Sequence, residues 1–226
     1  MKIVKFVIGI TTMAIAVAMS KISLLGTSPI AAVPNVVSES MGSSIGLNTA
    51  LFLALLVVIQ LVLARPKKMS EAIPYLIQLI PGTLFGLFIN FFYGLLAPIL
   101  SSKSYPVQLI VLIISVFILA IGVIVEVNAD TIVMPGEGLP KTIAQVTNKP
   151  FSSVKLACDI GMVVTALLLS FLFGNPFLGI REGTIIAMLF TGPIISLLQQ
   201  LAFRRKNEVG LPISFFYVNF LIGIYY

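Results

Sequence analysis

The carboxylates within or beside the long apolar runs are the residues of this sequence best suited to chemistry. They are Glu126, Asp130, Glu137 and Asp159. A charge held inside a bilayer costs about 2.5–3.5 kcal/mol on insertion scales, so such side chains usually pair with another group or line a pathway. The chain has no histidine and a single cysteine, Cys158, which excludes a Ser-His-Asp triad, a histidine proton relay and a cysteine metal site. Any proton chemistry must therefore use Asp or Glu.

The composition identifies the medium around these carboxylates. Hydrophobic residues make up 58% of the 226 residues and charged residues only 10%, with a mean hydropathy of +1.11. Soluble domains carry roughly 25% charged residues, so this chain cannot cover a water-facing surface. We predict an all-α, polytopic transmembrane helix bundle of six or seven spans, forming one domain over residues 1–226. The composition indicates no enzyme and no cofactor.

The basic residues that produce the net charge of +6 lie at the ends of apolar runs. Cytoplasmic loops are enriched in Lys and Arg. Placing the N-terminus in the cytoplasm puts eleven basic residues on the inner side and leaves only Lys21, Lys103 and Arg181 outside. We therefore predict a cell inner membrane protein with a cytoplasmic N-terminus, whose partners include membrane lipid and exclude nucleic acid. The predicted spans cover about residues 6–19, 47–64, 73–100 (interrupted at Pro81-Gly82), 107–127, 154–173 and 183–203, and residues 211–226 form a tilted seventh span or an interfacial tail.

Two short segments interrupt the apolar pattern after the first and fourth spans. Each holds two prolines five positions apart. Proline fixes φ and has no N–H, and glycine tolerates positive φ, so we expect Met134–Pro140 to be neither helix interior nor strand. Short helices are expected to follow over about residues 35–40 and 141–146. The predicted hinge residues are Pro29, Pro34, Pro135, Gly136, Gly138 and Pro140.

The two proline pairs are 106 residues apart, and the same offset relates the Ala-rich 14–18 to 120–124. A cleaved signal peptide would have no reason to match an internal span, so we interpret the first apolar run as a span. A further match, Gly82-Thr83 with Gly183-Thr184, indicates two copies over about residues 5–100 and 107–203. Because each copy holds three spans, the copies must enter the membrane in opposite senses. That is the inverted repeat of many secondary transporters, which have broken helices at the midplane.

The polar residues near these breaks form the predicted substrate- or ion-binding site: Thr27, Ser28, Asn90, Glu126, Asn128, Asp130, Glu137 and Asp159. Simpler roles compete with this hypothesis. Glu137 suits a loop carboxylate at the headgroups, and Lys155 lies four residues before Asp159, where the two side chains can pair on one helix face. Helix N-termini favour anions and Glu137 favours cations, so the sign of the solute stays open.

Several motifs resemble those of the YczE/YitT-type bacterial membrane proteins. They are residues 26–29 (Gly-Thr-Ser-Pro), 135–139 (Pro-Gly-Glu-Gly-Leu), and 183–186 with 192–194. In that group an Asp usually follows the Pro-Gly, where this chain has Glu137. The resemblance extends over nearly the whole chain and implies a multi-span bacterial inner-membrane protein whose substrate is not known.

The leading functional hypothesis is a secondary transporter that moves a small-molecule solute by alternating access. One alternative is the substrate-binding membrane subunit of an ATPase-driven vitamin importer. Such a subunit would dock to an ATPase partner subunit through Ala14 and Ala18. Another is a non-transporting scaffold or sensor, which predicts no polar cavity between the repeats. A homo-oligomer is compatible with each of these.

Overall fold

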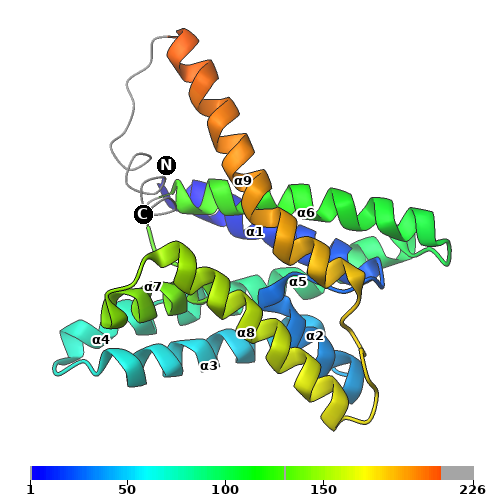
Figure 1. The fold of residues 1–226 in the computed structure, drawn as a ribbon, viewed down its shortest axis with the longest axis horizontal. Helices are drawn as coiled ribbons and strands as arrows, with labels where there is room; N and C mark the ends of the chain where they lie inside the picture. Colours follow the sequence, from blue (N-terminus) through cyan, green and yellow to red (C-terminus); the bar gives the residue numbers. More distant parts are fainter. Residues whose placement is uncertain (1, 130, 210–226) are drawn as a thin grey trace.

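The computed structural model describes residues 2–129 and 131–209, which fold into helices without a strand (Figure 1). Asp130 and the apolar segment 211–226, for which a binding role and a tilted span were predicted, lie outside the described residues. The helices are α1 (Lys2–Ile22), α2 (Pro29–Met41), α3 (Ile45–Ala64), α4 (Met69–Leu76), α5 (Leu79–Leu100), α6 (Tyr105–Val127), α7 (Pro135–Thr147), α8 (Phe151–Leu172) and α9 (Glu182–Val209).

Five segments of the described chain are long and apolar enough to cross a membrane, as predicted for the first five spans. They are Lys2–Ile22, Ile45–Ala64, Met69–Leu100, Tyr105–Val127 and Ser153–Leu172. The apolar part of α9, Glu182–Leu198, is shorter. Exposed large hydrophobic side chains are spread along these helices, which is the surface that a lipid environment stabilises and water does not.

The prediction that Met134–Pro140 is neither helix nor strand was wrong. α2 and α7 begin at Pro29 and Pro135. Proline suits the first helical position because the N–H of that position makes no intrahelical hydrogen bond in any case. Pro34 and Pro140, expected to start the helices, lie inside them. A proline inside a helix removes one hydrogen bond, and the surrounding packing keeps both helices intact.

The predicted break at Pro81-Gly82 is also displaced. The chain turns between α4 and α5 at Ile77 and Gln78, and Pro81 is the third residue of α5. A proline in the first helical turn removes no intrahelical hydrogen bond. The bend therefore forms just before this proline.

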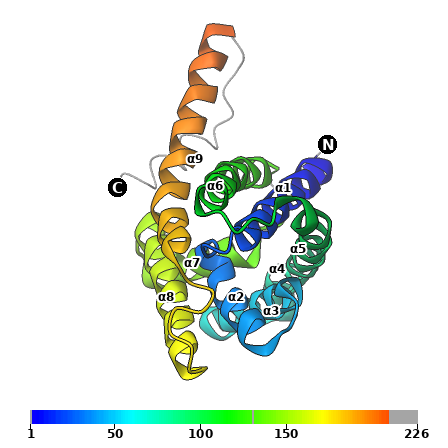
Figure 2. The same cartoon turned by 90° about the vertical axis from the view of Figure 1, so that its right-hand side faces the viewer.

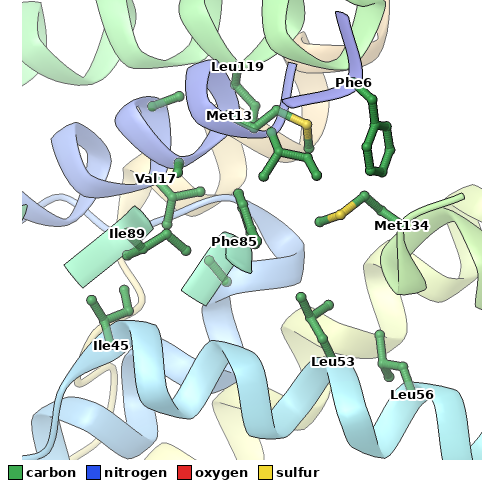
Figure 3. Close-up of a cluster of buried hydrophobic side chains, with 14 of the residues drawn as sticks. Phe6, Met13, Val17, Ile45, Leu53, Leu56, Phe85, Ile89, Leu119 and Met134 are labelled. Atoms are coloured by element: carbon green, nitrogen blue, oxygen red, sulfur yellow. The ribbon is translucent and has the colours of Figure 1, made fainter. Parts of the chain in front are cut away.

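The core is built around the crossing of α1 with α6 (Figure 3). A Cβ on Gly9 would lie 2.6 Å from the Glu126 nitrogen, and one on Gly122 would lie 2.7 Å from Met13 Cγ. These two contacts show that α1 and α6 run antiparallel with their backbones in close approach. Apolar side chains of α1, α3, α5 and α6 fill the space beneath, among them Val17, Leu53, Phe85 and Leu119.

The packing of α3 on α5 is closer than that of α8 on α9. A Cβ on Gly46 would lie 2.0 Å from the Gly86 carbonyl oxygen, so only glycine allows this approach. In contrast, α8 and α9 separate after their connecting loop and make few contacts (Figure 1). Figure 2 shows α2 between α3 and α8, packed on both.

Candidate functional site at the meeting point of α2 and α7

The N-terminal ends of α2 and α7 meet inside the bundle. A Cβ on Gly136 would lie 1.9 Å from Ile30 Cδ1, so the first turn of α7 lies directly against the first turn of α2. All six predicted hinge residues are buried here: Pro29, Pro34, Pro135, Gly136, Gly138 and Pro140. The two interrupted segments thus come together, as the sequence predicts.

A cavity of about 720 Å³ adjoins this meeting point. Its lining combines Ser28, Pro29 and Ile30 of the α2 end with Glu137 of α7, Lys155 and Asp159 of α8, and a run of α9 from Ala187 to Leu197. Apolar side chains of α1 and α6, Met13, Leu119 and Val123, complete the wall. The cavity therefore lies in the gap where α8 and α9 separate. Its volume is in the usual range for small-molecule sites, about 300–1,000 Å³.

Three polar side chains at this point have buried oxygens without a hydrogen-bond partner. They are Thr27 Oγ1, Ser28 Oγ and Glu137 Oε2. Thr27 is 0% and Ser28 is 4% exposed. Buried polar atoms are nearly always hydrogen-bonded, and one left unpaired costs about 1–3 kcal/mol. Such a cluster beside a cavity is typical of a site that a ligand completes.

Of the charged side chains that line the cavity, some are paired and one is not. Lys155 Nζ donates to Asp159 Oδ1 at 2.5 Å, so the predicted pairing within α8 is present. Glu137 has no such partner. Its burial raises the pKa of the Glu137 carboxyl above the ordinary value, while the nearby Lys155 ammonium lowers that pKa and Asp159 raises it. On α6, Glu126 is 4% exposed and interacts electrostatically with Glu137.

Two of the predicted site residues lie elsewhere. Asn90 Oδ1 accepts from the Gly46 N–H at 2.8 Å, and its Nδ2 donates to Ser44 Oγ, so Asn90 joins α5 to the start of α3. Asn128 is exposed and caps the C-terminus of α6. Thr27, Ser28, Glu126, Glu137 and Asp159 are brought together, whereas Asn90 and Asn128 have structural positions. Arg181 and Glu182 form an ion pair on the surface at 3.0 Å.

A polar network on the other side of α2 was not predicted. Lys21 Nζ, at the end of α1, donates to Asn35 Oδ1 at 2.9 Å, to Ser38 Oγ at 3.0 Å and to Glu39 Oε1. Asn35 Nδ2 in turn donates to the Gly179 carbonyl oxygen at 2.7 Å, which joins α2 to the loop before α9. The sequence does contain a signal for this network, because a lysine at the end of one helix is followed by polar residues on one face of the next helix. From the sequence, only a side of the membrane is predicted for Lys21.

A second polar group that was not predicted from the sequence lies beside α7. The amides of Gln60 and Gln78 donate to each other at 3.2 and 3.1 Å, and Thr142 Oγ1 donates to Gln60 Oε1 at 3.4 Å. A Cβ on Gly138 would lie 2.5 Å from Gln78 Oε1, so this glycine admits the amide pair. The polar atoms of the two amides satisfy each other. We interpret the group as a lock between α3, α7 and the start of α5 rather than as part of the site.

The comparisons with known proteins give a family without a function. Residues 1–200 match a family described as one of unknown function (DUF6198). No curated protein and no solved structure matches the chain.

Proposed function

The chain belongs to the DUF6198 family, whose function is unknown, and we propose that it is a bacterial inner-membrane transporter of a small-molecule solute. The observation that carries this proposal is the cavity of about 720 Å³ that reaches the unpartnered Ser28 and Glu137 at the meeting ends of α2 and α7. The resemblance to YczE/YitT-type proteins and the cytoplasmic N-terminus are part of the same proposal.

The packing supports an inverted repeat of α1–α5 and α6–α9. α2 and α7 each have 13 residues, begin at equivalent prolines, and end before Gly42 and Asn148, which are both left-handed and 106 positions apart. The first helices of the two copies, α1 and α6, are antiparallel, as copies of opposite sense require. The partners also exchange, because α2 packs on α8 and α7 packs on α3.

The two halves differ in one respect that supports alternating access. In the first half, Gly46 and Gly86 hold α3 against α5. In the second half, the equivalent helices α8 and α9 are apart and the cavity lies between them. The cavity extends from Ser28 towards Phe151, beside the basic inner loop, while Lys21 and Asn35 close the opposite side. We interpret this arrangement as the inward-open state of a transporter whose other state opens α3 from α5.

The alternatives receive less support. A scaffold or sensor predicts no polar cavity between the repeats, whereas this cavity reaches the polar side chains of Ser28, Glu137 and Asp159. The importer subunit requires Ala14 and Ala18 on the surface of α1, and both are 0% exposed within the chain. Their small side chains instead permit the close packing of α1 inside the bundle.

The proposal is tested by labelling from each side of the membrane. Cys158 is the only cysteine, so the Cys158→Ala variant is a cysteine-free chain into which one cysteine at a time can be introduced for labelling. We expect Ser28→Cys to react with a membrane-impermeant maleimide rapidly from the cytoplasmic face and more slowly, but measurably, from the outer face. This follows because alternating access opens the same site to both sides in turn.

Two exposed lysines, Lys68 on the inner side and Lys103 on the outer side, give control reporters. As single cysteines, each should react from one face only. If Ser28→Cys also reacts from only one face in sealed vesicles, alternating access is wrong. If the two lysine positions react from the opposite faces, the proposed orientation is wrong.

A further inference from the structure

The charges around the cavity do not balance, and this indicates the class of solute. Among the described residues that line the cavity, the carboxylates Glu137 and Asp159 share one cation, Lys155, which is already paired with Asp159. An uncompensated charge is costly away from water, so buried charges are paired with a counter-ion or neutralised by a proton. On the basis of the proposed function, we propose that the cavity binds a monovalent organic cation, with Glu137 as its counter-ion.

The helix N-termini offer little to an anion. Pro29 and Pro135, at the first position of each helix, have no N–H. In α7 the next two amides after Gly136, those of Glu137 and Gly138, donate to the Met134 carbonyl oxygen at 3.1 and 2.8 Å. Each helix end contributes about half a unit charge in favour of an anion. The full negative charge of the Glu137 carboxylate, which has an unpartnered oxygen, is larger than the partial charge of either end.

The internal prolines add acceptors at the same place. Pro34 and Pro140 have no N–H to donate to the carbonyl oxygens of Ile30 and Gly136, four residues earlier. Both of those residues belong to the contact between α2 and α7. The Ser28 hydroxyl, 4% exposed and without a partner, adds a polar oxygen to the cavity beside Glu137.

The remaining wall selects an organic rather than an inorganic cation. It is built mainly from apolar side chains of four helices, including Met13, Leu119, Phe151 and Met188. These surfaces gain free energy by contact with hydrocarbon, about 25 cal/mol per Å² buried, and none from a hydrated metal ion. A bulky ammonium or phosphonium ion satisfies both the carboxylate and the apolar wall.

Binding of such a cation exchanges it for a proton when Glu137 is protonated beforehand. The O–H bond of the carboxyl breaks, the proton leaves to solvent, and the carboxylate keeps the electron pair beside the cation. Binding therefore weakens as the pH falls through the pKa of Glu137. Burial raises that pKa, so the loss begins above the ordinary glutamate range near 4.3. The titratable groups facing Glu137 are Lys155 and Asp159 of α8 and Glu126 of α6.

Equilibrium dialysis of the purified full chain with radiolabelled tetraphenylphosphonium tests the inference. We expect Glu137→Gln to weaken binding at pH 8 by about tenfold or more, equivalent to about 1.4 kcal/mol, and to remove the pH dependence. Glu137→Asp, which keeps the charge, should retain binding and its pH dependence. Glu182→Gln is the matched control, because Glu182 is on the surface and paired with Arg181.

Tetraphenylborate, an anion of the same shape, separates charge from shape and should bind more weakly than the cation to the wild-type chain. Equal binding of the cation by the wild type and Glu137→Gln would overturn the inference, as would tighter binding of the anion. If the cation binds through Glu137 but Ser28→Cys reacts from one face only, the inference stands and the transport proposal fails. If Ser28→Cys reacts from both faces but Glu137→Gln binds the cation as the wild type does, the transport proposal stands and the inference fails.

Discussion

Gly26→Ala is expected to destabilise the protein by about 3 kcal/mol or more. Gly26 has φ +106°, outside the left-handed region that other residues can adopt at moderate cost. The added Cβ would also lie 2.3 Å from Thr184 Oγ1 and 3.0 Å from the Thr184 nitrogen. Because Thr184 Oγ1 accepts from the Thr27 N–H at 3.2 Å, moving Thr184 breaks the tie between the α2 entry loop and α9.

Gly42→Ala is the matched control for this prediction. Gly42 also has positive φ, +63°, but an added Cβ meets nothing within 4 Å. The expected cost is that of the left-handed conformation alone, about 1–2 kcal/mol. Thermal unfolding in detergent, followed by circular dichroism, should give a clearly larger fall in Tm for Gly26→Ala. Equal falls for the two variants would show that the contact with Thr184 does not constrain the entry loop.

Lys21→Met is expected to make Ser28 accessible from the outer face, with a labelling rate about tenfold higher than in the parent chain. Lys21 joins α1 to three polar residues of α2, and its side chain is 9% exposed. Charge-assisted hydrogen bonds contribute about 1.5–3 kcal/mol, and partial exposure of Glu39 reduces this value. A loss of about 1.4 kcal/mol shifts a two-state equilibrium tenfold.

The measurement is the rate of maleimide labelling of Ser28→Cys, from outside, with and without Lys21→Met in the Cys158→Ala background. Lys103→Met is the control, because Lys103 is an exposed lysine in the loop before α6. Faster labelling from outside with Lys21→Met, and not with Lys103→Met, supports a gate at Lys21. An unchanged rate would mean that the Lys21 network does not hold the outer side closed.

The sequence predicted the membrane environment, the first five spans and the meeting of the two interrupted segments. These follow from local signals: long apolar runs exclude water, and paired prolines mark irregular positions. The same local reasoning misplaced the helix starts. It treated Pro34 and Pro140 as first-turn residues, whereas the helices begin at Pro29 and Pro135 and tolerate an internal proline.

The composition of the site was only partly predictable. Glu137 and Ser28 stand out in the sequence because they are polar residues beside breaks in apolar runs. Lys21, Gln60 and Gln78 do not, since their roles depend on partners from distant parts of the chain or on burial. Asn90 was predicted from polarity alone, and its neighbours Gly46 and Ser44 give it a structural role instead. Spatial partners, rather than residue type, decide between these cases.

The most direct test of transport is the current across proteoliposomes that contain the purified chain alone, adsorbed on a solid-supported membrane. At a pH above the pKa of Glu137, where the cation binds without releasing a proton, we expect a jump in tetraethylammonium concentration to produce a current that saturates, is absent from protein-free liposomes, and is lost in Glu137→Gln. The same jump should produce the full current with Glu182→Gln. Absence of any current from the chain alone, with solute movement only when an ATPase partner subunit is added, would contradict it.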